Sequence, residues 1–158
     1  MRGFSSSIVV VIVLFATLGL PSAGHASERP AAWVSVDYRA GDFRLADGTR
    51  AADILVSPAD FRVVQIAAGE LAADIERVTG RKPALRAEAS GPSAHAVLVG
   101  TLGKSPLIDA LVGAGKLDVS GLRGLWESFL IATVPEPLPN VPVGLVIVGS
   151  DRRGTAFG

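Results

Sequence analysis

The sequence contains no cysteine, so neither disulfide bonds nor thiolate chemistry is available to this protein. If the chain is exported, side-chain packing alone must stabilise its fold. Histidine is nearly as scarce, since only His25 and His95 occur in 158 residues. This scarcity excludes a zinc site built from cysteine and histidine, and we expect neither a metal nor any other cofactor.

An excess of charge of either sign is also missing. The chain has 15 Lys and Arg residues and 15 Asp and Glu residues, and no long run of one sign occurs. Nucleic acids and anionic lipids attract proteins through concentrated positive charge. We therefore expect no nucleic-acid partner and no membrane surface as a partner.

The N-terminus has the features of a secretory signal. Arg2 gives a positive start, residues 8–20 form an apolar run, and Gly24 and Ala26 place small residues at a cleavage site. The run of about 13 residues is shorter than the roughly 20 needed to cross a bilayer, which disfavours a retained anchor. We predict a signal peptide at residues 1–26, export to the periplasm or the extracellular space, and no membrane attachment after cleavage.

Cleavage would leave His95 as the single imidazole of the mature chain. A Ser-His-Asp triad would have to use it, yet no Gly-x-Ser-x-Gly elbow accompanies it. We interpret His95 as a loop or strand-edge residue before an apolar run. The mature chain is predicted to comprise a lead-in at residues 27–42 and one α/β domain at residues 43–158.

Helical periodicity is clearest at residues 60–79, where Val64, Ala68 and Ile75 belong to an apolar stripe and Gly80 offers a left-handed C-cap. Glu70 and Asp74 share the other face, which we interpret as solvated. A second helix is expected after Ser105, which would cap it. Short strands are predicted at residues 43–45, 53–56, 84–87, 96–99, 129–134 and 143–148.

These elements predict a mixed sheet of about five or six strands with helices on both faces. The Asp47-Gly48 dipeptide would join the first two strands as a hairpin, and the proline-rich residues 135–142 would form a stiff loop. After the last strand, Ser150 or Asp151 is placed to cap a helix. Almost none of that helix remains before Gly158, so we expect a truncated last helix that leaves one sheet face partly bare.

Two local patterns suggest functions without establishing them. Gly103-Lys104-Ser105 follows an apolar strand as in a phosphate-binding P-loop, but the glycine required five residues earlier is Leu98. Trp126 beside Glu127 resembles a sugar-stacking platform with a carboxylate. We interpret the first pattern as a tight turn and Trp126 as a core or domain-interface residue.

Four segments in order along the chain form a larger pattern: residues 68–83, 97–108, 115–129 and 149–155. Together they resemble the N-terminal domain of glycoside hydrolase family 115, the xylan α-1,2-glucuronidases. The resemblance extends from about residue 43 to residue 158. At the end, Ala156-Phe157-Gly158 departs mildly from the family pattern.

The resemblance implies a domain that precedes a TIM-like barrel, which removes (4-O-methyl)glucuronic acid from xylan with inversion. Inverting enzymes use two carboxyl groups about 6.5 to 9.5 Å apart. The barrel lies outside this sequence, so no catalytic residue is assigned, and this chain alone is expected to be inactive. Its polysaccharide partner, glucuronoxylan, would bind through the barrel, and homo-oligomerisation of the full-length enzyme is left open.

The turn at residues 151–155 leads from the last strand towards the expected barrel, and we hypothesise that it docks this domain beside the catalytic mouth. Asp151, Arg152 and Arg153 are therefore the candidate substrate-binding residues, because a guanidinium group matches the geometry of a uronate carboxylate. Ion pairing at a domain interface explains the arginines equally well. A different class of function is an autonomous extracytoplasmic carbohydrate-binding module using Trp33 and Trp126, although aromatic residues make up only 6% of the chain.

Overall fold

The computed structural model describes residue 35, residues 37–39, residues 42–87 and residues 95–158. Residues 37–158 form one compact unit, and the fold described below is that of this unit. The predicted signal peptide and Trp33 lie outside the described residues. Within the described part of the chain, no helix has the length and apolar character required to cross a membrane.

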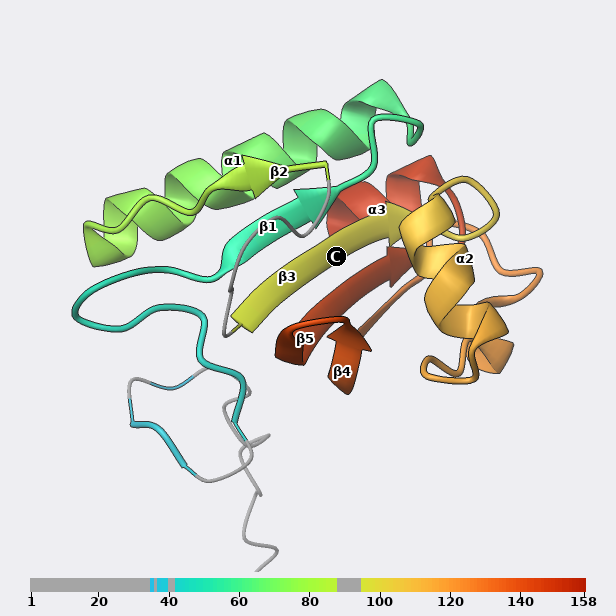
Figure 1. Ribbon diagram of the computed structural model, residues 1–158. Helices are drawn as coiled ribbons and strands as arrows, with labels where there is room; N and C mark the ends of the chain where they lie inside the picture. Colours follow the sequence, from blue (N-terminus) through green and yellow to red (C-terminus); the bar gives the residue numbers. More distant parts are fainter. Residues whose placement is uncertain (1–34, 36, 40–41, 88–94) are drawn as a thin grey trace, which may run out of the picture. The chain divides into compact units, whose positions relative to one another are not determined.

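A single five-stranded sheet forms the centre of the unit, in the order β2-β1-β3-β5-β4 (Figure 1). Four of these strands are parallel and β4 is antiparallel to its neighbour β5. The expected α/β class and mixed sheet are thus confirmed. The strands are β1 (Asp53–Val56), β2 (Leu85–Arg86), β3 (His95–Thr101), β4 (Phe129–Leu138) and β5 (Val141–Gly149).

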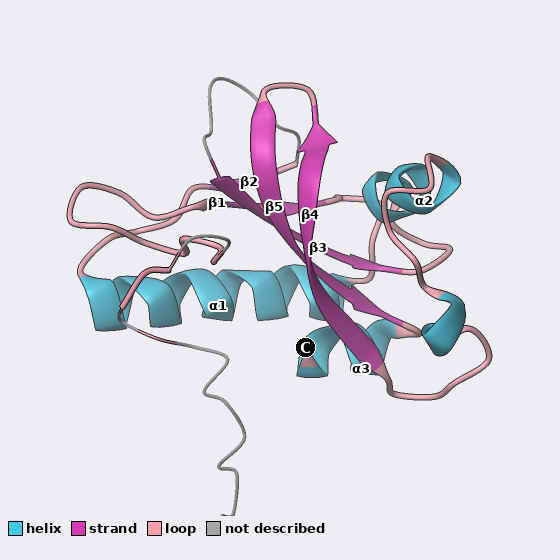
Figure 2. Ribbon diagram, turned by 90° about the horizontal axis from the view of Figure 1, so that it is seen from below, coloured by secondary structure: helices cyan, strands magenta, loops and turns pink. Residues whose placement is uncertain are grey.

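Helices cover both faces of the sheet. Helix α1 (Arg62–Thr79) and the short helix α3 (Arg152–Phe157) lie on one face, and α2 (Pro106–Gly113) lies on the other (Figure 2). A 3-10 turn (Ser120–Leu122) follows α2. Alternation along the strands divides the core: Ile54 and Val97 pack towards α1, whereas Leu98 packs towards α2.

Helix α1 follows its sequence pattern closely. Val64, Ala68, Ala72 and Ile75 are buried, and Gly80 ends the helix with a positive φ of 68°. Val78, three positions after Ile75, continues the apolar period of the sequence but is largely exposed. The buried face of the helix therefore ends at Ile75. The helix also begins two residues later than expected, at Arg62.

The turn expected at Asp47-Gly48 is present, but the two-stranded hairpin around it does not form. Residues 43–45 form no strand, and the turn is closed by one isolated antiparallel bridge between Ala46 and Ala51. Strand β1 instead pairs in parallel with β2 and β3. The Asp47 carboxylate closes the local turn by accepting the backbone N–H groups of Thr49 and Arg50. Strand β1 itself is buried on both faces by helices.

The stiff proline loop is also wrong. Strand β4 continues through Pro135 and Pro137 to Leu138, and a turn at Asn140, with φ 65°, returns the chain into β5. Because β4 is the edge strand, the missing proline N–H groups interrupt no ladder on its outer side. A register shift between Pro135 and Leu138 accommodates the irregular backbone there.

The last helix is more complete than expected. Residues 152–157 form α3, whose N-cap is Asp151, and α3 packs against α1 and β5. Two glycines allow this close packing. A Cβ atom on Gly149 would lie 2.0 Å from the Thr155 nitrogen, and one on Gly154 would lie 2.3 Å from the Ser128 carbonyl oxygen.

Candidate functional site

The carboxyl ends of β1, β3 and β5 meet at one edge of the sheet, where open α/β sheets usually present functional groups. The chain leaves β1 towards β2 and leaves β3 towards β5 on the other side, so a topological switch point lies between β1 and β3. In this chain the switch point is occupied by the buried carboxylate of Asp60. The Asp60 side chain accepts the Phe61 N–H and the Thr101 N–H, both at 2.7 Å.

Asp60 directly precedes Phe61, the N-cap residue of α1, and its second hydrogen bond joins the β1–α1 connection to the end of β3. Thr101 continues this network, since its hydroxyl lies 2.8 Å from the hydroxyl of Thr155. The Thr155 hydroxyl also donates to the Asp151 carbonyl. The network fixes the three strand ends relative to one another.

The three residues predicted to bind substrate lie at the start of α3. One carboxylate oxygen of Asp151 accepts the N–H groups of Arg153 and Gly154, and the other accepts the N–H of Glu127 at 2.8 Å. These hydrogen bonds, that of Glu127 first, lower the pKa of Asp151 below its ordinary value. Asp151 is therefore a structural cap that also fixes the segment before β4.

The two arginines differ in their surroundings. Arg153 forms an ion pair with Glu127 at 2.9 Å, and its guanidinium group lies 5.7 Å from the ring centroid of Phe157. Arg152 is exposed on the same helix. The structure thus brings Asp151 and Arg153 together around Glu127, a residue that the sequence interpretation had paired with Trp126 alone.

Beside this ion pair the surface is apolar. Trp126 is 86% exposed, so it is not a core residue of this unit, and its interpretation as a domain-interface residue stays a prediction. Leu125, Phe129 and Phe157 are also exposed large apolar side chains. We call Leu125, Trp126, Phe129 and Phe157 the aromatic corner. An exposed tryptophan next to an arginine-carboxylate pair is suited to contact a sugar ring or another protein surface.

The other motifs are explained by local structure. The Gly103 N–H donates to the Asp109 carboxylate at 2.8 Å, so the turn at Gly103-Lys104-Ser105 does not offer that group to a phosphate. The Lys104 ammonium lies over the Phe61 ring. Ser105 is the N-cap residue of α2, as expected, but its side chain makes no capping hydrogen bond.

The carboxylates of α1 have the solvated positions expected for them. Glu70 and Asp74 are exposed, and Asp74 forms an ion pair with Arg77. Among the residues that the structure describes, no group of three or more potential metal ligands occurs.

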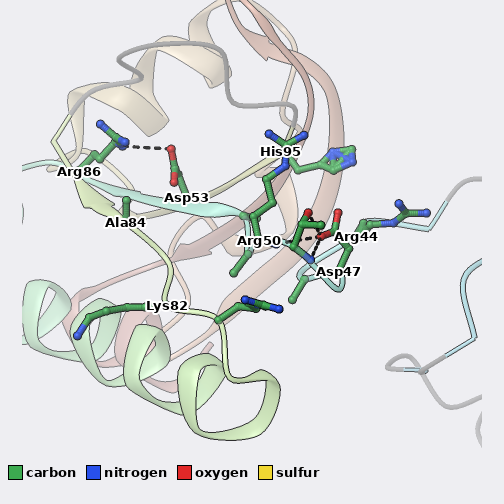
Figure 3. A pocket seen from close by; sticks show the side chains of 13 residues that line it. Arg44, Asp47, Arg50, Asp53, Lys82, Ala84, Arg86 and His95 are labelled. Atoms are coloured by element: carbon green, nitrogen blue, oxygen red, sulfur yellow. Dashed lines mark hydrogen bonds and ion pairs between the residues drawn. The ribbon is translucent and has the colours of Figure 1, made fainter.

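A cavity of about 460 Å³ lies at the opposite edge of the sheet, around the amino ends of β1 and β3 (Figure 3). Five cationic side chains and His95 line it, together with two aspartates. We call it the basic cavity. Its lining residues are Arg44, Ala46, Asp47, Thr49, Arg50, Ala51, Ala52, Asp53, Arg81, Lys82, Ala84, Arg86 and His95.

Sequence reasoning missed the basic cavity. Its cations come from residues 44–50 and 81–86, which carry no recognisable motif. Parallel pairing of β1 with β2 and β3 brings these segments and His95 together. His95 is the first residue of β3, as expected of a strand-edge residue, and its pKa is lowered by desolvation and then by the charges of Arg44 and Arg50.

Comparison with known proteins found similarity to solved structures. No protein-family model matches the chain, and no curated protein matches it. A solved structure of a family GH115 4-O-methyl-α-glucuronidase, with specificity for decorated arabinogalactans, superposes with a TM-score of 0.54 and 26% sequence identity. The match covers 69% of this chain and 12% of that enzyme. The chain therefore has a GH115-related fold and resembles a glycoside hydrolase over a small part of that enzyme's length.

Proposed function

We propose that this chain is the N-terminal, non-catalytic α/β domain of an exported glycoside hydrolase that removes (4-O-methyl)glucuronic acid side chains from xylan. The observation that carries the proposal is the similarity in fold and sequence to a GH115 glucuronidase. That enzyme acts on decorated arabinogalactans, so arabinogalactan is the alternative polysaccharide to be tested. The active site would lie in a catalytic barrel outside these 158 residues.

Three aspartates of the chain are unsuited to act as a general acid. A general acid for glycoside hydrolysis needs a raised pKa. Among the described residues, each carboxyl group with a resolved shift has its pKa lowered: Asp47, Asp118 and Asp151. The Thr49 hydroxyl and nearby backbone N–H groups donate to Asp47, and backbone N–H groups donate to Asp118 and Asp151. These hydrogen bonds favour the ionised form. None of the three is suited to donate a proton to a leaving sugar oxygen near neutral pH.

The turn Asp151–Thr155 and the aromatic corner would contact the catalytic part of the enzyme. Asp151 fixes both the start of α3 and the segment that carries Trp126, so this surface is preorganised. Arg152 is the better candidate for a uronate carboxylate, because Arg153 already pairs with Glu127. A guanidinium group presents two parallel donors that match a carboxylate.

The test of this function is release of 4-O-methylglucuronic acid from glucuronoxylan and from decorated arabinogalactan. The longer enzyme containing this chain should release the acid, and the purified chain alone should release none. Release by the chain alone would overturn the non-catalytic role. Failure of the longer enzyme on both polysaccharides would overturn the glucuronidase assignment.

The two arginines can be tested in the longer enzyme. Arg152→Ala should raise KM or lower turnover for glucuronoxylan, whereas the exposed Arg123→Ala serves as a matched control that changes neither. Arg153→Ala separates the two explanations for that residue. If affinity and turnover remain unchanged while thermal stability falls, Arg153 has a structural role through Glu127 and no role in substrate binding.

One observation favours a second candidate function, a carbohydrate-binding module. Trp126 is 86% exposed, as a sugar-stacking residue would be. Retention of the chain on insoluble xylan, abolished by Trp126→Ala and unaffected by Val78→Ala at another exposed apolar position, would support it. A chain that passes through xylan unretarded would exclude this candidate and leave Trp126 as a domain-contact residue.

A further inference from the structure

The basic cavity concentrates positive charge in a chain whose net charge is zero. Five of the 15 Lys and Arg residues line it, against two aspartates. The hollow exists because Ala46, Ala51, Ala52 and Ala84 contribute only methyl groups to its lining. Its volume, about 460 Å³, lies in the range typical of small-molecule sites.

The two aspartates do not neutralise this charge equally. Asp47 is occupied within its own turn, where it accepts the Thr49 N–H at 2.7 Å, the Thr49 hydroxyl and the Arg50 N–H. Asp53 pairs with Arg86 at 3.1 Å. Figure 3 shows both carboxylates with dashed contacts to these neighbours, and Arg50 extending from its loop towards His95.

The remaining cationic side chains differ in whether other groups already engage them. Arg81 donates to the Gly48 carbonyl, and Lys82 pairs with Glu76 of α1 at 3.3 Å. Arg44 lies over the ring of Tyr38 at 4.4 Å, a contact that leaves the donors at the edge of its guanidinium group available. Arg44 and Arg50 are both exposed, and both act electrostatically on His95. These two arginines are therefore the groups best placed to meet an incoming anion.

We propose that the basic cavity binds the carboxylate group of an acidic saccharide. Arg44 and Arg50 would supply the charge-assisted hydrogen bonds, because a guanidinium fork matches the two oxygens of a carboxylate. The positive field of the cavity selects the anion, and the mostly polar rim suits a hydroxylated ring. The saccharide part of this inference rests on the proposed function, whereas the preference for an oxyanion rests on the cavity alone.

The basic cavity and the turn proposed to contact the barrel lie at opposite edges of the sheet. The cavity lies at the amino ends of the parallel strands, whereas α3 and the aromatic corner lie at their carboxyl ends. A second uronate site on the same enzyme would hold a decorated polysaccharide chain near the catalytic domain and raise its local concentration there. It would contribute to affinity for the polymer without taking part in bond cleavage.

The experiment is an NMR titration of the full chain with glucuronate, glucose and inorganic sulfate, following backbone amides and the His95 imidazole. Glucuronate should shift His95 and residues 44–53, glucose should not, and sulfate should bind at least about tenfold more weakly than glucuronate. Raising the salt concentration from about 50 to 300 mM should weaken the glucuronate response, because the arginines are exposed.

Arg50→Gln and Arg44→Gln should each weaken glucuronate binding by about tenfold, the loss of one charge-assisted contact. Arg123→Gln, an exposed arginine outside the cavity, is the matched control and should bind as the unaltered chain does. If a cavity variant fails to fold, the comparison of glucuronate with glucose on the unaltered chain still decides the question.

Three results would overturn the inference. Absence of glucuronate binding up to about 10 mM would show that the basic cavity is not a carboxylate-binding site. Equal affinity for sulfate would remove its saccharide specificity and leave a general oxyanion site. Unchanged glucuronate binding in both cavity variants would place the contact elsewhere. Enzymatic release of glucuronic acid is measured separately, so a failed glucuronidase assignment with intact binding would be recognised as such.

Discussion

Replacing Asp60 by alanine removes the carboxylate that joins the β1–α1 connection to the end of β3. Two backbone N–H groups, those of Phe61 and Thr101, lose their acceptor. The two amides differ in what can replace it. Phe61 lies at the exposed start of α1, where water can reach its N–H, whereas Thr101 is only 2% exposed.

The expected cost follows from this difference. A net hydrogen bond to a charged group stabilises by about 1.5 to 3 kcal/mol, and an unsatisfied buried donor costs a similar amount. With water replacing the acceptor at Phe61, Asp60→Ala should lower the free energy of unfolding by about 2 to 4 kcal/mol. Asp60→Asn keeps one acceptor oxygen and should cost about half as much.

Urea unfolding followed by far-ultraviolet circular dichroism measures these free energies. The matched control is Asp109→Ala, which removes an exposed carboxylate that also accepts a backbone N–H, that of Gly103. Because water can replace that acceptor, the control should cost no more than about 1 kcal/mol. If Asp60→Ala cost as little as the control, the buried link between β1 and β3 would not stabilise the fold as described.

Three further predictions concern other parts of the domain. Gly154→Ala should destabilise the chain by at least about 2 kcal/mol in the same unfolding assay, because its Cβ would overlap the Ser128 carbonyl; no change would mean that α3 packs elsewhere. Asp151 has a folded-state pKa below its unfolded value, so its stabilisation is present above the unfolded pKa, near 3.8, and is lost as pH falls through the folded value. Asp151→Asn should therefore reduce the loss of stability between neutral and acidic pH, and an unaltered acid dependence would contradict this. Arg44→Gln should raise the pKa of His95 in an NMR titration, because the Arg44 charge lowers it. An unchanged pKa would mean that the Arg44 guanidinium group does not lie close to His95 in the cavity.

Elements with strong local patterns could be predicted from the sequence. Helix α1 combines a helical apolar period with Gly80 at its end, and both signals depend only on neighbours in the chain. The apolar runs that became β3 and β5 also needed no tertiary information, since strands buried on both faces are apolar throughout. The mixed α/β sheet followed from their alternation with helices.

The errors arose where tertiary position overrides a local signal. Proline normally interrupts strands, yet β4 tolerates Pro135 and Pro137 because an edge strand needs no donor on its outer side. The Asp47-Gly48 dipeptide suggested a hairpin, yet the following strand found parallel partners on both sides instead. Only the pairing partners distinguish these outcomes, and they lie far away in the sequence.

The candidate sites also differ in whether their signals are local or depend on distant parts of the chain. Asp151 was predicted as a helix cap because its effect is local, and the structure confirms that role. The link from Asp60 to Thr101 spans 41 positions and the basic cavity joins segments from Arg44 to His95. Neither carries a sequence motif, since each depends on which strands become neighbours.

The most direct test of the proposed function is release of 4-O-methylglucuronic acid from glucuronoxylan, measured in parallel for the longer enzyme and for this chain alone. The proposal predicts release by the longer enzyme and none by the chain, because the catalytic carboxyl groups are proposed to lie in the barrel outside these 158 residues. Release by the chain alone, or no release by the longer enzyme from either glucuronoxylan or decorated arabinogalactan, would contradict it.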